Sequence, residues 1–339
     1  MPAAAAFVQA QFLPVVLVTA ICVGCSFPQA GVAVSQLPNL TAFVTTAMFV
    51  ISGLQLRQGE ALQALKARGA VAFGIISILL ITPLISLAVL RLPLHPPELA
   101  IGLAVFCCMP TALSSGVTLT QQIGGNVALA LLLTVSTNML GVFTMPFTLP
   151  ALLGPALAGS VRLEPLPLLV KLVKTILVPS LVGASIRAFV PGAAAFVDAR
   201  KKYLTYSNAL LLALVPWTQI SKAVAQRVPL EAGSLLVAAA AGVGVHLAFL
   251  ALNIGACRLL RLGGPDPAAA LAVRRAVILV GSVKTLPVAV SVLASLGPAL
   301  GPMAGVAVVP AMSAHLSQII IDSMLVARWQ AQDRAAKAA

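Results

Sequence analysis

The sequence Phe106-Cys-Cys-Met-Pro110-Thr-Ala-Leu-Ser114-Ser115-Gly116 interrupts one apolar segment, and Leu279-Val-Gly281-Ser282-Val-Lys284-Thr285-Leu-Pro287 interrupts another. A membrane-spanning helix must satisfy its own backbone, because lipid offers no hydrogen-bond partners. Interrupted helices are therefore tolerated only where the break faces protein or a water-filled cavity. A matched pair of breaks, one in each half of a chain, points to the substrate site of a secondary transporter.

The composition predicts an all-α membrane protein. Hydrophobic residues make up 60% of the 339 residues, charged residues only 9%, and the mean hydropathy is +1.05. A soluble domain has about 25% charged residues. The lipid bilayer is therefore an expected partner of this chain.

Two other classes of protein are excluded by pattern. The net charge of +13 does not indicate nucleic-acid binding, because the basic residues lie between the apolar segments, where membrane topology places them. The sequence also contains no paired-carboxylate site, HExxH, GxSxG or Walker loop. We therefore expect no enzyme, no catalytic residue, no cofactor and no metal other than a sodium ion. Without a nucleotide site, transport must be driven by an ion or substrate gradient.

Ten apolar segments predict ten transmembrane helices in a single domain over residues 1–339. Their expected ranges are 8–27, 40–56, 70–90, 98–119, 126–153, 166–190, 204–220, 232–260, 274–296 and 302–328. Ten divides into five and five, and a repeat with an odd number of spans must be inserted upside down the second time. The predicted inverted repeats are 8–153 and 166–328, with the breaks in spans four and nine.

Basic residues predict the orientation. Fourteen lie on the side that would hold both termini and the loops after spans two, four, six and eight, whereas six lie on the other side. The excess predicts that both termini are in the cytoplasm or the stroma of a plastid.

The first break supplies candidate ligands. Pro110 removes a backbone donor and frees a carbonyl one turn earlier. Freed carbonyls and the hydroxyls of Ser114 and Ser115 suit sodium, and the amides that begin the next half-helix at Gly116 suit a carboxylate. The alternative is that small polar residues only allow helices to pack closely.

Span five carries polar residues on one face. Thr134, Thr137 and Asn138 follow i, i+3, i+4 spacing, so this face should point into the protein. Thr134 and Asn138 are candidate ion ligands. Asn126 is a candidate N-cap for the same helix.

The second break adds Ser282, Lys284 and Thr285 as candidate substrate ligands. Lys284 is the only basic residue well inside a span, about ten residues or roughly 15 Å deep by helical rise. An ionisable group at that depth indicates function unless it has a structural partner. Asp322, the only acid well inside a span, is one candidate partner.

Two further spans carry polar residues at depth. His315 and Gln318 share a face of span ten, and they are expected to line the same cavity as substrate and ion ligands respectively. His246 in span eight is expected to be a packing histidine.

These motifs resemble the bile acid:sodium symporter superfamily, and most closely its SBF-like branch in bacteria and plant plastids. The similarity rests on Met109–Gly116, Gly124-Gly125-Asn126, Gly281-Ser282-Val283-Lys284-Thr285-Leu286, and the pair His315 and Gln318. It covers almost the whole chain. It implies a core domain of spans 3–5 and 8–10, a panel domain of spans 1, 2, 6 and 7, and crossing of spans four and nine at their breaks.

The resemblance also implies sodium-coupled uptake of a small organic anion, such as a 2-keto acid, across a plastid inner envelope or a bacterial plasma membrane. One departure bears on the coupling ion. Sodium-coupled relatives carry a Glu and a Gln in the stretch where this chain has Leu279–Val283, and Ala130 replaces a serine ligand. Lys284 places a fixed positive charge close by.

Three functions follow from the sequence. The first is a sodium-coupled symporter of a small organic anion. The second is a sodium-independent or proton-coupled carrier in which Lys284 is a built-in cation. The third is a membrane regulator that keeps the fold without transport.

The charge bias generates a test of topology. A cysteine introduced at Gln58, in a background without reactive native thiols, should be labelled by an impermeant maleimide only from the cytoplasmic or stromal face. Labelling from the opposite face would show that the span count or its orientation is wrong.

Overall fold

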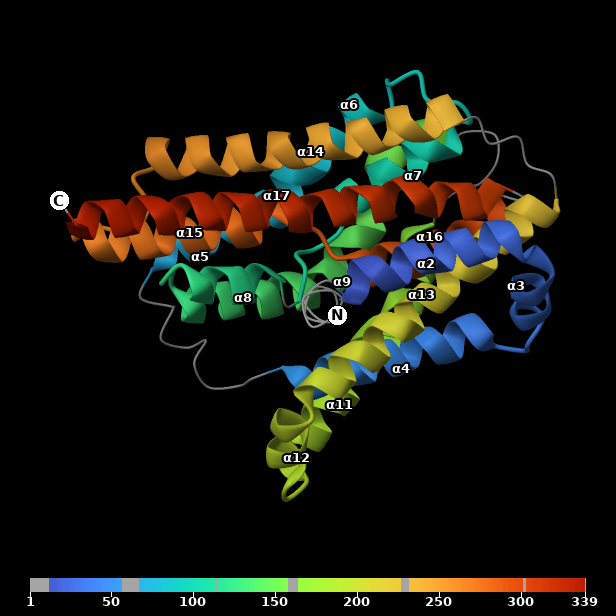
Figure 1. Cartoon of the computed structure of the whole chain (residues 1–339), viewed down its shortest axis with the longest axis horizontal. Coiled ribbons are helices and arrows are strands. Elements are labelled where there is room, and N and C mark those ends of the chain that lie inside the picture. Colours follow the sequence, from blue (N-terminus) through green and yellow to red (C-terminus); the bar gives the residue numbers. More distant parts are fainter. Residues whose placement is uncertain are drawn as a thin grey trace.

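The structure is a computed structural model that describes residues 12–56, 67–113, 115–157, 164–226, 232–300 and 303–338. Nearly all of these residues are helical, as the sequence predicts (Figure 1). The first half contains α2 (Phe12–Ser26), α3 (Pro28–Ser35), α4 (Leu40–Gln55), α5 (Arg68–Ile76), η2 (Ser77–Ile81), η3 (Thr82–Leu84), α6 (Ile85–Val89), α7 (Glu98–Cys107), α8 (Ser115–Gln122) and α9 (Val127–Leu157). The second half contains α10 (Pro165–Leu172), η4 (Val173–Leu177), α11 (Val178–Phe189), α12 (Ala193–Ala199), α13 (Lys201–Ala225), α14 (Ala232–Leu259), α15 (Pro267–Ser282), α16 (Leu286–Leu300) and α17 (Ala304–Ala338).

The chain is a multi-pass membrane protein. Six segments of the described chain are long and apolar enough to cross a bilayer: Arg68–Val89, Val127–Pro155, Pro165–Phe189, Gly233–Leu259, Pro267–Leu296 and Gly305–Ala336. A seventh results if α2 and α3, which meet at 102°, are counted as one bent span.

The other expected spans fall short for separate reasons. α4 has only 16 residues, and α7 ends after 10 at the first break. α13 has 25 residues, but polar and basic side chains such as Lys201, Asn208 and Lys222 lower its hydropathy.

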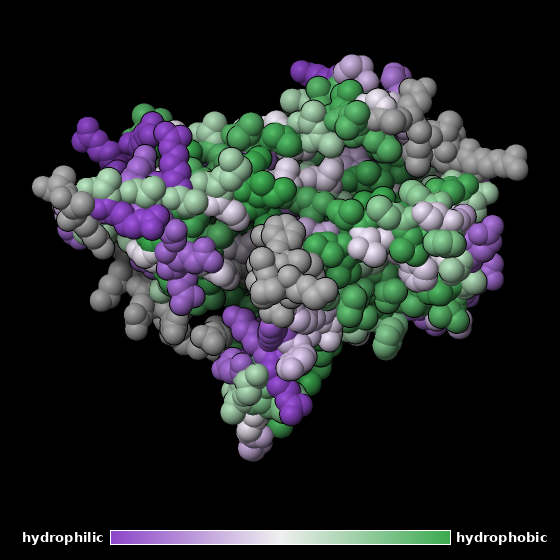
Figure 2. All heavy atoms as spheres, viewed as in Figure 1, coloured by the Kyte–Doolittle hydropathy of each residue, from purple (hydrophilic) through white to green (hydrophobic). Residues whose placement is uncertain are grey.

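The surface fits a lipid environment. Figure 2 shows hydrophobic side chains over most of this face, whereas hydrophilic ones gather where α17 ends and around α12. Large apolar side chains are exposed on many helices, including Phe43, Phe147, Leu236 and Met324. In water such a surface would aggregate, but against acyl chains it carries no penalty.

Both predicted breaks are present. The chain leaves helical geometry between Cys107 and Ser115, and again between Ser282 and Leu286. The predicted N-cap is confirmed as well, because the Asn126 side chain accepts the Leu129 N–H at 2.9 Å. Four irregularities were not predicted: the π-turns η2 and η4, and the short helices α3 and α12.

Helices approach closely where glycines allow it. One group comprises α2, α3, α4, α11 and α13, and a second comprises α7, α8 and α14–α17. In the first group, a Cβ at Gly53 would overlap the Ser180 carbonyl, and one at Gly183 would overlap the Val50 carbonyl. In the second, a Cβ at Gly102 of α7 would overlap the carbonyl oxygen of Ala307 in α17.

The Gly102 contact generates a prediction of stability. Gly102→Ala should force α7 and α17 apart and destabilise the fold by about 1–3 kcal/mol, as overpacking of a tight core does. Gly244→Ala in α14 is the matched control, because nothing lies within 4 Å of its added Cβ. Thermal unfolding in detergent micelles should show a lower midpoint for Gly102→Ala alone. Equal midpoints for the two variants would refute the close approach.

Candidate functional site

The two helix breaks contact each other directly. The backbone N–H of Thr285 donates to the Pro110 carbonyl at 3.0 Å, and the Thr111 hydroxyl donates to the Val280 carbonyl at 2.6 Å. Each break therefore satisfies peptide groups of the other. Pro110, Thr111 and Thr285 are all buried.

The ammonium of Lys284 lies at this crossing and makes three hydrogen bonds. Nζ donates to the Ile78 carbonyl, the Thr82 hydroxyl and the Met109 carbonyl, each at 2.8 Å. It also lies 5.4 Å from the ring centroid of Phe249. An ammonium has three donors, so all of them are used by the protein, and the side chain is 0% exposed.

These oxygens are free because the backbone is irregular around them. In a straight α-helix the Thr82 N–H would bond to the Ile78 carbonyl. Here η2 is a π-turn, and that N–H bonds to Ser77 instead. Pro83 in η3 contributes no donor, and Met109 lies in the first break. Local sequence thus creates an oxygen-rich position for a cation.

The helix ends add to this preference for a cation. α7 ends at Cys107, two residues before the Met109 carbonyl that accepts from Nζ, and α15 ends at Ser282, two residues before Lys284 itself. The C-terminal end of a helix carries partial negative charge from its unpaired carbonyls. Both ends favour the positive group in this position.

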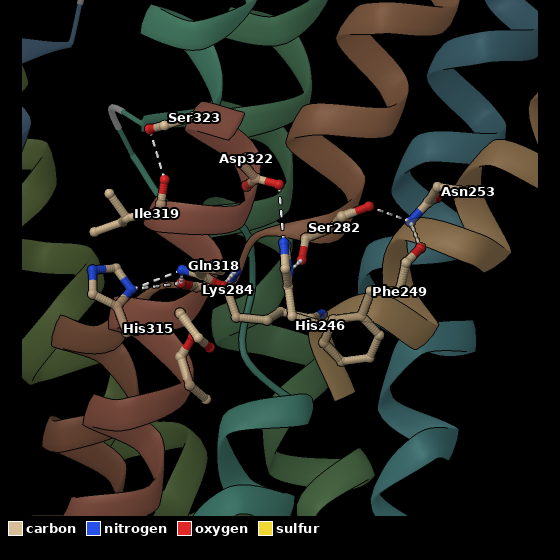
Figure 3. Close-up of polar contacts among 12 residues, drawn as sticks. His246, Phe249, Asn253, Ser282, Lys284, His315, Gln318, Ile319, Asp322 and Ser323 are labelled. Carbon is tan, nitrogen blue, oxygen red and sulfur yellow. Dashed lines mark hydrogen bonds and ion pairs between the residues drawn. The ribbon is translucent and has the colours of Figure 1, made fainter. Parts of the chain in front are cut away.

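Gln318 holds the main chain of Lys284. Its Oε1 accepts the Lys284 N–H at 3.0 Å, and its Nε2 donates to the Lys284 carbonyl at 2.8 Å. The same Nε2 lies 2.8 Å from Nδ1 of His315, which is also 3.3 Å from the Lys284 carbonyl (Figure 3). Gln318 and His315 therefore brace the second break in this conformation.

His246 is more than a packing histidine. Its Nε2 lies 2.9 Å from Oδ1 of Asp322, and its Nδ1 lies 3.1 Å from the Ser282 carbonyl (Figure 3). The candidate pair of Lys284 and Asp322 is wrong, because Asp322 faces α14 and its contact is with His246. Lys284 instead points toward η2, η3 and the first break.

The remaining predicted residues are spread around the crossing. Ser282 Oγ accepts from Asn253 at 3.2 Å, and Thr134 donates to the Ala130 carbonyl of its own helix at 2.8 Å. Asn138 donates to the carbonyls of Thr111 and Thr134 at 3.0 and 2.8 Å. The face that carries Thr134 and Asn138 is buried, as the sequence predicts.

The structure describes only one of the two candidate serines near the first break, Ser115. Ser114 lies outside the described residues. The hydroxyl of Ser115 is buried and has no hydrogen-bond partner among the described residues. A Cβ at Gly116 would lie 3.2 Å from the Val280 side chain, so Gly116 brings α8 close to α15.

Two hollows are found among the described residues. The larger has a volume of about 410 Å³ and is bounded by α3, α4, α10, η4, α13 and α16. Its polar lining residues are Ser35, Asn39, Thr41, Thr45, Lys171, Thr175, Gln219, Ser291 and Ser295. The smaller, of about 20 Å³, is lined by Asn138, Leu113, Ser52 and Ser180 among others. It has room for about one water molecule.

The fold and this crossing can now be compared with known proteins. Residues 11–331 match the model of the SBF-like CPA transporter family. The chain belongs to that family. Proteins named "Probable sodium/metabolite cotransporter BASS4, chloroplastic" are similar to it: the Oryza sativa subsp. indica protein is 41% identical, over 97% of this chain and 77% of the relative. The Arabidopsis thaliana protein is 40% identical, over 95% and 73%.

A more distant relative is an animal protein. The Sodium/bile acid cotransporter 7-B of Xenopus laevis is 28% identical over 63% of this chain and 62% of its own length. Membership of the family agrees with the resemblance that the two break motifs indicate.

Several residues of the site were missed from the sequence. Ser77, Thr82, Asn253 and Thr111 join the polar network, and Ser291 and Ser295 line the larger hollow. A signal existed for Asn253, an amide in the middle of an apolar segment. No pattern marks Thr82, because its role depends on the π-turn before it.

The ammonium contacts generate a prediction. Thr82→Val keeps the side-chain shape but leaves a buried ammonium donor unpaired, which should cost about 1–3 kcal/mol of stability. The cost should largely vanish in a Lys284→Met background, since the donor is then absent. Thr148→Val, whose hydroxyl bonds only within its own helix, is the control. Unfolding midpoints of the four variants test this, and additive effects would contradict it.

Proposed function

We propose that this protein is a secondary transporter of small organic anions in which the Lys284 ammonium serves as a built-in cation. One observation carries the proposal: three oxygens, two from η2 and η3 and one from the first break, surround Nζ at 2.8 Å. Carbonyl and hydroxyl oxygens are the ligands that a sodium ion would take in such a break. A tethered ammonium in this position removes the need for a metal ion there.

The geometry also bears on the predicted contact between Lys284 and substrate. All three ammonium donors are satisfied by protein, so a bound anion receives no hydrogen bond from Nζ in this conformation. The charge acts on the anion through its field, which is strong in a dry interior. Ser282, Thr285 and His315 are likewise buried, and they support the break rather than line either described hollow.

The larger hollow suits a small anion. It presents hydroxyls, the Gln219 amide and the Lys171 ammonium, and no acidic side chain lines it among the described residues. Hydroxyl and amide donors with one cation are a typical receptor for a carboxylate. The hollow lies between the two helix groups, where a relative shift would open it to either side.

The architecture that accompanies this proposal has ten spans in two inverted repeats. The element order supports it, because the break between α7 and α8 and that between α15 and α16 fall in the fourth segment of each half. The contacts among α2, α3, α4, α11 and α13 support a panel of spans 1, 2, 6 and 7 beside a core of spans 3–5 and 8–10. The basic residues support termini on the cytoplasmic or stromal side, and the chloroplastic relatives support a plastid envelope, with a bacterial plasma membrane as the alternative.

Sodium coupling is the second candidate. The names of the plant and frog relatives favour it, and the small cavity beside Asn138, Ser52 and Ser180 offers hard oxygen ligands away from Lys284. Leu113, which lines the same cavity, lies two residues before Ser115, the first residue of α8. Gln318 is an unsuitable sodium ligand in this conformation, because its amide is bonded to Lys284 and His315.

Uptake by proteoliposomes distinguishes these candidates. With radiolabelled pyruvate as the probe, we expect wild-type uptake to be equal in sodium and choline buffers. Lys284→Gln should abolish it, and Lys284→Arg should restore little, because a planar guanidinium cannot direct three donors at the same oxygens. Lys174→Gln is the control, since Lys174 is exposed in η4.

Each other outcome has a defined meaning. Uptake that requires an inward sodium gradient would replace the proposal with sodium-coupled symport. Normal uptake by Lys284→Gln would make this lysine a structural residue. Absence of uptake and counterflow for a panel of small carboxylates, in protein that stays folded, would favour the membrane regulator.

A further inference from the structure

The two contacts of His246 are both hydrogen bonds only when two protons are present. The Ser282 carbonyl can only accept, so the contact of 3.1 Å is a hydrogen bond when Nδ1 carries a proton. The contact of 2.9 Å between Nε2 and Asp322 Oδ1 needs a second proton between two atoms that would otherwise both be acceptors. That proton belongs to an imidazolium beside a carboxylate or to a carboxylic acid beside a neutral imidazole. The total is the same in both forms.

The second proton has an unusual setting. Asp322 is 0% exposed and His246 is 2% exposed. The other carboxylate oxygen, Oδ2, is buried and has no hydrogen-bond partner among the described residues. A buried structural carboxylate normally has both oxygens bonded. Because Oδ2 has no partner, Asp322 can accept a hydrogen bond from another group or bind a proton at this oxygen.

Other titratable groups near the pair are few. On α17 itself, His315 lies about two turns before Asp322, and the break after α15 brings Lys284, whose donors are satisfied elsewhere. Each helix packed against the pair contributes a small set: Glu98 at the start of α7 and Cys107 with Cys108 at its end, Cys257 with Arg258 on α14, and Arg274 with Arg275 on α15. Arg275 is bonded to Asp333, about three turns beyond Asp322.

The other three neighbours add no charge close to the pair. α8 and α16 contain no titratable side chain. α13 contacts α17 at Gly305, where an added Cβ would overlap the Gln219 carbonyl. Gly305 lies about five helical turns before Asp322. Within the described chain, His246 is the partner of Asp322, and the proton between them is the one in question.

We propose that His246 and Asp322 form a proton-binding site, and that the proton held there is exchanged during the transport cycle. The proposal rests on the proposed function for its role in transport, but the site itself does not. Release of the proton leaves a neutral imidazole, protonated at Nδ1, facing an ionised carboxylate, and the proton passes to water on the side to which the site has opened. Nε2 and Oδ1 are then both acceptors at hydrogen-bond distance, which is repulsive.

Loss of the proton therefore has a structural effect. With the remaining ring proton held on Nδ1 by the Ser282 carbonyl, the two side chains must separate. Ser282 is the last residue of α15, before the break that holds Lys284. The change is transmitted to the crossing through one hydrogen bond. A singly charged anion that moves together with this proton carries no net charge across the membrane, so transport should be insensitive to the membrane potential.

The site can be tested without a substrate. The chain has three histidines, so ¹⁵N-histidine NMR of the full chain in lipid nanodiscs yields few ring signals, and His246→Gln assigns those of His246. We expect the Nε2 signal to shift in one pH titration while Nδ1 stays protonated, and the titration to move to a different pH in Asp322→Asn. Asp333→Asn, the same change on α17 where the carboxylate meets Arg275, should leave it unmoved.

The same variants test the role in transport. In proteoliposomes with radiolabelled pyruvate, an inward proton gradient should drive wild-type accumulation, and this should be lost in Asp322→Asn and in His246→Gln. Counterflow exchange, which needs no net proton movement, should persist in both. The amide introduced by Asp322→Asn can donate an N–H to the unprotonated Nε2 of a neutral ring, so this variant is the less disruptive of the two.

The outcomes separate the two ideas. A titration of His246 that is identical in wild type and Asp322→Asn would overturn the proton site, whatever transport shows. A coupled titration without any pyruvate counterflow would keep the site and count against the proposed function. Counterflow with proton-driven accumulation that survives in both variants would overturn the coupling role while leaving the transporter.

Discussion

The structure depends on one constraint: peptide groups released by a broken helix in a dry interior must find new partners. Two breaks and one π-turn release such groups at a single place, and the chain pairs them with one another. Pro110 accepts from Thr285, Thr111 donates to Val280, and the Lys284 ammonium takes the remaining oxygens. An unmet buried carbonyl or amide costs several kcal/mol in hydrocarbon, so this arrangement decides how the surrounding helices can pack.

Features that depend on local chemistry could be predicted from the sequence. Proline, glycine and serine in an apolar run located both breaks, and Asn126 identified the start of α9. The period of Thr134 and Asn138 identified an inward face, because helical spacing converts directly into a direction. The depth of Lys284 followed from counting residues.

Features that depend on how helices rotate against one another could not be predicted. Lys284 and Asp322 are each the isolated charge of their segment, which made them candidate partners, yet His246 contacts the acid and three oxygens hold the lysine. The π-turn at Ser77–Ile81 has no composition that distinguishes it from an α-helical stretch, although it frees the Ile78 carbonyl. Length and hydropathy alone also do not show whether α4 and α13 cross the membrane. A helix that is partly shielded from lipid by other helices can be shorter or less hydrophobic than a span surrounded by lipid.

The polar contacts of Lys284, Gln318, His246 and Asn253 all lie within the group that contains α7 and α14–α17, together with η2 and η3. The Gly102 contact with Ala307 fixes two of these helices at the shortest separation that backbone atoms permit. Such a group is stiff: its elements have no small displacement that keeps both the hydrogen bonds and the close packing. A shift of the other helices past it must break the contacts between the groups, which include the close approach of α13 to α17 at Gln219 and Gly305. A change at one buried side chain is then expressed as tilt or translation of the entire unit, since no single helix can absorb the strain alone.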